Sequence, residues 1–441
     1  MKRTNNFLIF YFFGLLLSIM NPNRFKLKNG LSVVVVPMRE SASVTVAVLV
    51  QAGSAYESKN NNGISHFLEH MCFKGTPKRP SPFLISSEFE NLGASYNAFT
   101  SRDLTGYYGK VSFDHAEQIT DLISDMYLNP LFKEEEIKKE KGVIIEEINM
   151  YEDQPRAKVS QILEKVMYGD QPAGWDVAGP KENILKMDKA DFFDYRKKHY
   201  IAQKTFVVFA GHISVPEAKK LAVKYFSNIT VGSKIKSHPV SNKQNKPATT
   251  FKFKELDQTH FALAFKAFSI FDERRFSLAI LSDIIGGGMS SRLFQKIREE
   301  LGAAYYVGAS SSLYATHGYL EIFAGVNHKK FQEAAKAIIQ ELKKVALDGV
   351  TDDEISRAKE HNIGNFMLSL ETSSDLAFYF GEQLVLSEKI LSPDQVVQKI
   401  KSVTKSDLAR LARQILQNKN LNFAIVGPYK SDKEFRGILS L

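Results

Sequence analysis

Apolar and polar residues along the first half of the chain alternate between strand-like and helix-like patterns. Five segments are rich in β-branched or alternating apolar residues between polar turns, which predicts strands. They are residues 31–37, 44–51, 96–100, 105–111 and 205–211. Five further segments carry apolar residues at helical spacing. They are residues 64–73, 81–92, 115–128, 134–168 and 215–226.

The order of elements recurs after one polar stretch. Residues 232–249 are poor in hydrophobic residues and contain two prolines, which predicts an interdomain linker. Beyond it, strands are predicted over residues 260–266, 304–311, 318–324 and 421–427. Helices are predicted over residues 274–285, 291–301, 330–347 and 352–386. The recurrence indicates two diverged copies of one α+β unit of roughly 200 residues.

Composition narrows the class of protein. The chain has 441 residues, of which 44% are hydrophobic and 24% charged, so a globular protein of two or more domains is expected. Its net charge is +9, but the 58 basic residues are scattered among 49 acidic ones, without the clustered basic face of a nucleic-acid-binding protein. Cys72 is the single cysteine, so His and carboxylate groups must hold any metal.

The N-terminal segment allows two interpretations of localisation. Residues 1–20 carry Lys2 and Arg3 before an uncharged apolar run from Phe7, as a signal peptide or anchor does. No small-x-small cleavage site follows, and the run is short for a membrane span. Met20 is an alternative start. The protein is cytoplasmic if translation begins there, and exported, periplasmic or membrane-anchored if residues 1–20 are a genuine signal.

Residues 66–70 read His-Phe-Leu-Glu-His and carry the clearest chemistry. On a helix, His66 and His70 lie one above the other, so both imidazoles can reach one metal ion. Glu69 lies close enough to that face to touch a water molecule on the metal. Zinc with three protein ligands leaves a fourth coordination position for water. The alternative interpretation is that two histidines four residues apart occur by chance on an amphipathic helix. A third ligand is needed.

The segment from Asn62 to Thr76, with this His-x-x-Glu-His core and the following Phe73-Lys74-Gly75-Thr76, resembles the active-site helix of M16 metallopeptidases. These inverzincins include pitrilysin, insulysin and the β-subunit of the mitochondrial processing peptidase. The resemblance covers nearly the whole chain from about Asn21. It implies an α+β fold of two homologous domains, each a mostly antiparallel sheet packed with helices. The catalytic domain would span residues 21–231 and an inactive domain residues 250–441.

The resemblance also implies a zinc-dependent endopeptidase with one zinc per chain. In the family a glutamate on a separate helix completes the ligand set, and Glu146 and Glu147 lie 76 and 77 residues after His70. Glu147 is preferred, because the family keeps a supporting glutamate seven residues before the ligand and Glu140 then fits. His66, His70 and Glu147 would hold the metal, and Glu69 would be the base.

Two further groups of residues match the family. Asn97, Ala98, Phe99 and Thr100 resemble the edge strand that takes the substrate as an added strand, although a plain core strand has the same pattern. Arg298 and Tyr305, seven residues apart, resemble a pair that holds the substrate backbone and supports the oxyanion. Tyr306 is adjacent, so the register could shift by one. An ordinary surface Arg and a core Tyr are the alternative.

The second half has no counterpart of His-x-x-Glu-His in its residues 276–285, so it is expected to act as a wall of the site. Active members of the family enclose peptides or unfolded segments between four such domains. A two-domain chain would therefore form a homodimer, or a heterodimer with a related chain. Membrane association is expected only if the N-terminal segment is an uncleaved anchor. The rival interpretation is a non-catalytic structural subunit of the same fold.

Overall fold

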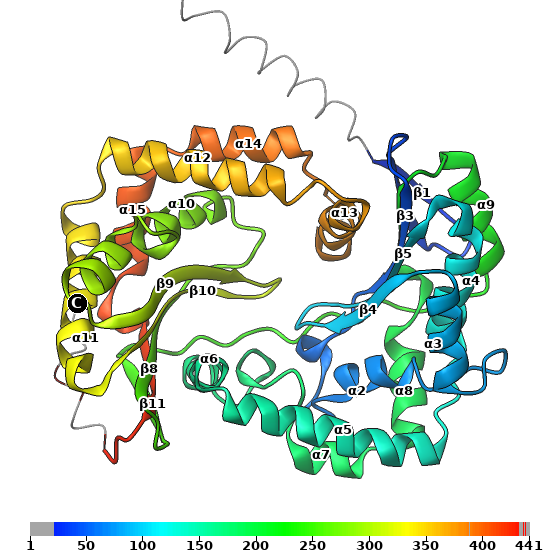
Figure 1. Ribbon diagram of the computed structural model, residues 1–441, viewed down its shortest axis with the longest axis horizontal. Helices are drawn as coiled ribbons and strands as arrows, with labels where there is room; N and C mark the ends of the chain where they lie inside the picture. The colour runs from blue at the N-terminus through cyan, green and yellow to red at the C-terminus, as the bar shows by residue number, and fades with distance from the viewer. Residues whose placement is uncertain (1–21, 388, 432–434, 436, 438–441) are drawn as a thin grey trace, which may run out of the picture. The chain divides into compact units, whose positions relative to one another are not determined.

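A computed structural model describes residues 22–387, 389–431, 435 and 437 (Figure 1). The predicted leader at residues 1–20 lies outside this part of the chain. The described residues form two compact units. The first comprises Met1–Ile145, Asp176–His238 and Phe366–Gln398, as far as these are described. The second comprises Glu146–Trp175, Pro239–Asn365 and Lys399–Leu441, with the same restriction.

The first unit contains a six-stranded mixed sheet in the order β1-β2-β6-β3-β5-β4. Its strands are β1 (Asn23–Lys26), β2 (Ser32–Pro37), β3 (Ser43–Val50), β4 (Ser95–Thr100), β5 (Thr105–Ser112) and β6 (Thr205–Gly211). All neighbours pair antiparallel except β2 and β6, which are parallel. The five predicted strands are present within about one residue of their predicted ends, and β1 was not predicted.

The helices of the first half flank this sheet or lead away from it (Figure 1). They are α2 (Ile64–Met71), α3 (Pro82–Asn91), α4 (Ala116–Leu128), α5 (Glu134–Asp153), α6 (Pro155–Tyr168), α7 (Lys181–Lys186), α8 (Lys189–His199) and α9 (Val215–Phe226). The prediction of one helix over residues 134–168 was wrong. Gln154 has an extended backbone, with ψ of 99°, because Pro155 disfavours helical geometry in the residue before it.

The second unit contains a five-stranded sheet in the order β7-β11-β8-β10-β9. Its strands are β7 (Ala248–Phe253), β8 (Gln258–Lys266), β9 (Ala304–Leu313), β10 (Gly318–Asn327) and β11 (Leu421–Gly427). β7 and β11 are parallel and the other pairs antiparallel. The order repeats β2-β6-β3-β5-β4 strand for strand, which confirms the predicted α+β fold of two related, mostly antiparallel sheets packed with helices.

The second half adds several helices. They are α10 (Arg275–Gly286), a π-helix (Phe294–Glu300), α11 (Phe331–Leu347), α12 (Asp352–Leu368), α13 (Ser373–Ser387), α14 (Pro393–Ser402) and α15 (Lys405–Ile415). The single helical stretch predicted over residues 352–386 is divided into α12 and α13. The backbone N–H of Thr372 donates to the Asp375 carboxylate, and that of Asp375 donates to the Thr372 hydroxyl, so a reciprocal cap starts a new helix there.

Each half of the sequence contributes helical segments, chiefly α13 and α6, to the unit built around the sheet of the other half. α13 packs on β2, β3 and β6 through an apolar cluster that contains Val34, Leu49, Val208, Leu376, Phe380 and Leu384. α6 packs on the second sheet through a cluster that contains Val159, Leu163, Met167, Ala262, Ala264 and Val426. The compact units therefore do not coincide with the sequence halves, and the domain boundaries around residues 232–249 stay a prediction.

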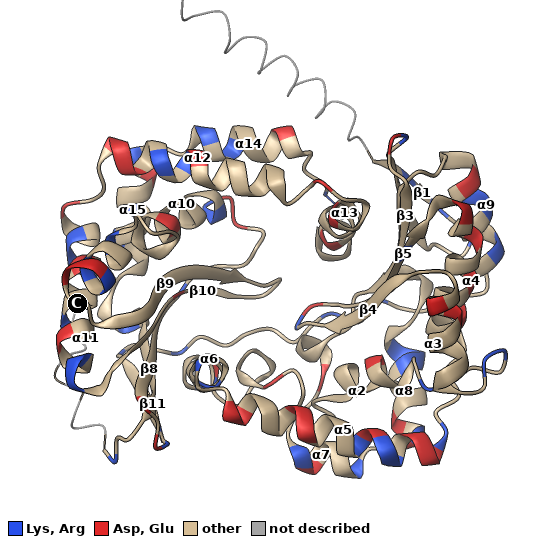
Figure 2. Cartoon of the chain, viewed as in Figure 1, with Lys and Arg blue, Asp and Glu red and all other residues tan. Residues whose placement is uncertain are grey.

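Basic and acidic residues occur together on the same helices. Lys and Arg alternate with Asp and Glu along the helices of both units (Figure 2). Among the described residues, no helix combines the length and apolar character needed to cross a membrane.

Candidate metal centre

The helix that carries His-x-x-Glu-His begins on a buried carboxylate. Glu57 accepts hydrogen bonds from the backbone N–H groups of Gly63 and Ser65, at 2.9 and 2.8 Å, and from the Asn62 amide at 2.9 Å. Burial raises the pKa of Glu57, and these hydrogen bonds oppose the rise. Helix N-termini leave N–H groups unsatisfied, so Glu57 supplies acceptors that the helix itself lacks. Sequence reasoning missed Glu57, because a cap six residues upstream has no local signature.

Two further contacts fix this helix in place. Gly63 has a φ of 100°, and a Cβ there would lie 2.6 Å from the carbonyl oxygen of Ala178, so only glycine fits. The hydroxyl groups of Ser65 and Tyr195 lie 2.7 Å apart and join α2 to α8. The face of α2 that carries the two histidines is thereby held rigidly.

The Nε2 atoms of His66 and His70 lie 3.3 Å apart, with their ring centroids 4.6 Å apart. In tetrahedral sites with Zn–N bonds of about 2.0–2.1 Å, two nitrogen ligands are separated by about 3.3–3.4 Å. Burial and the neighbouring His70 lower the pKa of His66 to about 4, so its imidazole is neutral at neutral pH. The two nitrogens therefore have the spacing that zinc requires, and His66 has the neutral ring that a zinc ligand needs.

Glu147 completes the donor set. One ligand atom from each of His66, His70 and Glu147 can be chosen so that all three lie within 4.8 Å of one another. Glu147 belongs to α5, which is one continuous helix. The boundary between the two compact units falls within this helix, between residues 145 and 146. Glu147 is half-buried, whereas Glu146 is exposed and accepts a long hydrogen bond from Asn149. The structure thus brings Glu147, and not its neighbour, to the histidines.

Glu140 lies directly behind His70. One carboxylate oxygen of Glu140 lies 2.8 Å from the Nδ1 atom of His70, and the other lies 2.6 Å from the Nζ atom of Lys74. Burial favours the protonated carboxyl, but the hydrogen bonds from His70 and Lys74 outweigh it and lower the pKa of Glu140. An ionised Glu140 orients His70 with Nε2 toward the metal position, as acceptors behind metal-binding histidines do.

Glu69 faces the edge strand β4. The hydroxyl of Thr100 donates to a carboxylate oxygen of Glu69 at 2.6 Å. Within the described residues β4 pairs only with β5, so its other edge stays open. Asn97 is exposed, whereas Ala98 is buried and Phe99 packs on Phe378 at a ring distance of 5.6 Å. The part of β4 that is available for binding is therefore the unpaired edge of its backbone, because the side chains of Ala98 and Phe99 are packed inside the unit.

The second unit places Arg298 and Tyr305 at the surface. Arg298 is exposed on the π-helix, with its guanidinium 5.1 Å from the centre of the Phe294 ring. Tyr305 is 70% exposed. In the ladder with β10, Ala304 pairs with Val326 and Tyr306 with Gly325, so Tyr305 is the extra residue of a bulge. Bulges re-aim side chains, and this one turns Tyr305 toward solvent.

Tyr306 is engaged in the structure of its own unit. Its hydroxyl lies 2.8 Å from the Nδ1 atom of His260, and the guanidinium of Arg156 lies 4.8 Å from its ring centre. Burial raises the pKa of Tyr306 to about 12. Of the two neighbouring tyrosines, Tyr305 therefore has the accessible hydroxyl.

Comparison with known proteins identifies the family. Residues 33–181 match the model of Insulinase (Peptidase family M16), and residues 186–362 match the model of the Peptidase M16 inactive domain. An uncharacterized zinc protease of Bacillus subtilis, YmxG, is 34% identical over 405 residues, which cover 92% of this chain and 98% of the relative. The chain belongs to the M16 peptidase family. A zinc protease of Rickettsia bellii, also uncharacterized, is 34% identical over 92% of this M16 peptidase and 98% of its own length.

Solved structures share the fold of this M16 peptidase. A protease from Helicobacter pylori has a TM-score of 0.86 and 23% identity, with 92% of this chain and 99% of the other covered. A peptidase M16 inactive domain from Pseudomonas fluorescens has a TM-score of 0.86 and 18% identity, covering 93% and 99% of the two chains. At these identities the likeness concerns the fold alone.

Proposed function

We propose that this M16 peptidase is a zinc-dependent endopeptidase that cleaves peptides or unfolded protein segments. The observation that carries the proposal is the convergence of donor atoms from His66, His70 and Glu147 within 4.8 Å. The names of the relatives, which are zinc proteases, support it. A zinc ion held by these three residues supplies a Lewis acid that activates water and polarises the scissile carbonyl.

The residues of this chain do the rest of the chemistry. Glu69 accepts a proton from the attacking water and passes it to the leaving amine. Thr100 donates to Glu69 and holds its carboxylate beside β4. Glu140 fixes the orientation of His70. Each of these groups is positioned before substrate arrives, so little reorganisation accompanies the reaction.

Substrate binding is proposed at the free edge of β4. A peptide added there as a further strand would pair with the backbone of residues 97–100, which selects extended shape over sequence. Arg298 would bind the substrate backbone, and the Tyr305 hydroxyl would donate to the oxyanion. A closed chamber needs further walls, so a second copy of the chain is the simplest partner, and a related chain is the alternative.

The non-catalytic subunit is the second candidate, and the complete donor set disfavours it. A structural role requires neither three converging metal ligands nor a carboxylate between the histidines. Zinc content and peptide cleavage of the purified protein distinguish the two functions: the enzyme contains one zinc per chain and cleaves a quenched peptide library, whereas the structural subunit does neither.

Glu69→Gln provides the direct test. The variant should bind zinc stoichiometrically but lose peptide cleavage by about 100-fold to 10,000-fold, because the water loses its proton acceptor. Glu90→Gln, which removes an exposed carboxylate from α3, is the matched control and should cleave at the normal rate. Full activity in Glu69→Gln would refute the proposed role of Glu69.

A further inference from the structure

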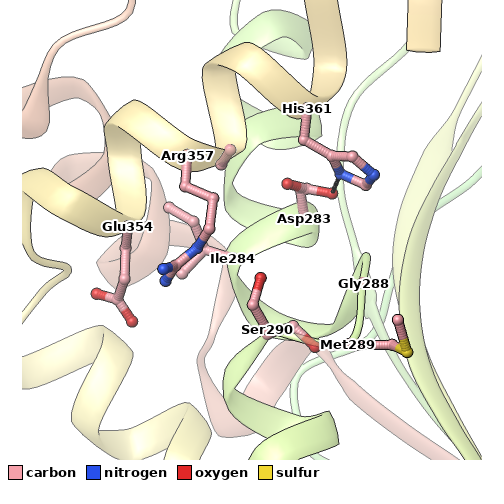
Figure 3. A pocket seen from close by; sticks show the side chains of 10 residues that line it. Asp283, Ile284, Gly288, Met289, Ser290, Glu354, Arg357 and His361 are labelled. Atoms are coloured by element: carbon pink, nitrogen blue, oxygen red, sulfur yellow. Dashed lines mark hydrogen bonds and ion pairs between the residues drawn. The ribbon is translucent and has the colours of Figure 1, made fainter. Parts of the chain in front are cut away.

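The second unit contains a polar cavity that the proposed peptidase chemistry does not use (Figure 3). It lies between the C-terminal end of α10, the turn that follows it and the first half of α12, and its volume is about 310 Å³. The residues that line it are Asp283, Ile284, Gly288, Met289, Ser290, Ser291, Glu354, Arg357, Ala358 and His361. This volume is near the lower end of the range for ligand pockets, so the cavity can hold a small molecule or one functional group of a larger ligand.

The two carboxylates of the cavity already have partners. Glu354 accepts hydrogen bonds from Arg292 at 2.6 and 2.9 Å. Burial favours the protonated acid, but the hydrogen bonds from Arg292 and Thr351 outweigh it and bring the pKa of Glu354 to about 2. Asp283 lies 2.8 Å from the Nδ1 atom of His361. Glu354 is therefore paired with a guanidinium, and Asp283 lies beside an imidazole.

Arg357 supplies a further positive charge to the cavity. Among the described residues it has no hydrogen-bond or ion-pair partner, and Figure 3 shows its guanidinium extending along the cavity beside Ile284. Because Glu354 is bound to Arg292, the guanidinium donors of Arg357 remain available. A planar guanidinium of this kind matches carboxylate and phosphate oxygens in geometry and charge.

Two serines that follow α10 also line the cavity. Ser291 is only 6% exposed, and within the described residues its hydroxyl has no hydrogen-bond partner. A buried hydroxyl without a partner carries a free-energy cost that a bound ligand would remove. Ser290 is exposed, and its hydroxyl points into the same space (Figure 3). Gly288 leaves room there, because a Cβ would lie no closer than 3.6 Å to its nearest neighbour, on His361.

We propose that this cavity binds a small oxyanion, a carboxylate or phosphate group, between the guanidinium of Arg357 and the hydroxyls of Ser290 and Ser291. The ligand would satisfy the buried Ser291 hydroxyl and form charge-assisted hydrogen bonds with Arg357. The turn that contains these serines leads into the π-helix that carries Arg298. The ligand would therefore lie close in sequence to a residue that is proposed to bind substrate. The binding itself does not rest on peptidase activity.

Isothermal titration calorimetry of the full-length protein tests the site with two probes at constant ionic strength. Inorganic phosphate represents the phosphate source, and N-acetylglycine represents the carboxylate source without a competing amine. At least one probe should bind the wild-type protein, and the probe that binds identifies the class of ligand. If neither probe binds, the proposal is wrong.

Two independent variants locate the binding. Arg357→Gln removes the guanidinium, and Gly288→Leu fills the cavity from a backbone position that tolerates a side chain. Each should weaken binding about tenfold or more, as expected for the loss of charge-assisted hydrogen bonds or of the space itself. Lys359→Gln removes the same charge from a residue of α12 outside the cavity, and should bind as the wild type does.

The outcomes are distinct from those of the peptidase tests. An oxyanion bound at the zinc position would survive Arg357→Gln and Gly288→Leu, and that result would overturn the proposal. Unchanged binding in Arg357→Gln alone would also overturn it, because Arg357 supplies the charge. Zinc content and peptide cleavage, measured on the same wild-type and variant proteins, test the proposed peptidase function separately from oxyanion binding.

Discussion

The Nδ1 atom of His70 lies 2.8 Å from a carboxylate oxygen of Glu140. This contact sets the orientation of one proposed zinc ligand from a helix 70 residues further along the chain. Glu140→Gln keeps the shape of the side chain but removes the charge that fixes the imidazole. Zinc affinity should fall about 10-fold to 100-fold, measured as zinc retained against graded chelator. Glu136→Gln, one turn earlier on α5, is the control, and equal zinc retention in both variants would contradict the role of Glu140.

The two adjacent glutamates of α5 should differ in zinc binding. Glu147→Gln removes a charged donor from the group of three, so the purified variant should contain much less zinc. Glu146→Gln changes an exposed side chain and should retain one zinc per chain. Atomic emission measures both directly. The reverse result would mean that the ligand is Glu146 and that the proposed support by Glu140 is wrong.

Thr100 is expected to position Glu69. Thr100→Val preserves the shape of the side chain but removes the hydroxyl that donates to Glu69 at 2.6 Å. The catalytic constant should fall by about tenfold, as expected for a hydrogen bond to a charged group, with zinc content unchanged. Ser95→Ala, at the exposed start of the same strand, should cleave normally. If the two variants cleave peptides at the same rate, the contact does not serve catalysis.

Substitution of the two neighbouring tyrosines of β9 should affect different properties, catalysis for Tyr305 and stability for Tyr306. Tyr305→Phe should lower the catalytic constant by about 100-fold to 1,000-fold without loss of zinc, because the oxyanion loses a donor. Tyr306→Phe should keep the catalytic constant but reduce stability by about 1 kcal/mol, since its hydroxyl lies 2.8 Å from His260. Steady-state kinetics and urea unfolding measure the two effects. A silent Tyr305→Phe would remove Tyr305 from the mechanism.

The first unit should depend on a helix from the second half of the sequence. Phe380 of α13 is fully buried against the first sheet, so Phe380→Ala should destabilise the protein by about 3–5 kcal/mol in urea unfolding. Leu368→Ala, at an exposed position of α12, should change stability by less than about 0.5 kcal/mol. Equal unfolding midpoints for the two variants would show that α13 contributes little to the first unit.

The sequence by itself determined the local features of this protein. Strand and helix periods follow from the alternation of side chains within a few residues, so every strand except β1 and β7 was found with small errors at its ends. His66, Glu69 and His70 are set by spacing along one helix. Glu147 needed the family resemblance, because a long charged helix gives no local sign of which carboxylate faces a metal.

Tertiary structure decided the relationships between distant segments. The Thr100 contact with Glu69, the Glu57 cap of α2, the bulge at Tyr305 and the exchange of α6 and α13 between units have no local signature. Each depends on which apolar faces pack together, and several packings are compatible with the same periodic pattern. A residue's nearest neighbours in sequence fix its backbone preference, whereas its partners across the fold are fixed only when the whole core is buried.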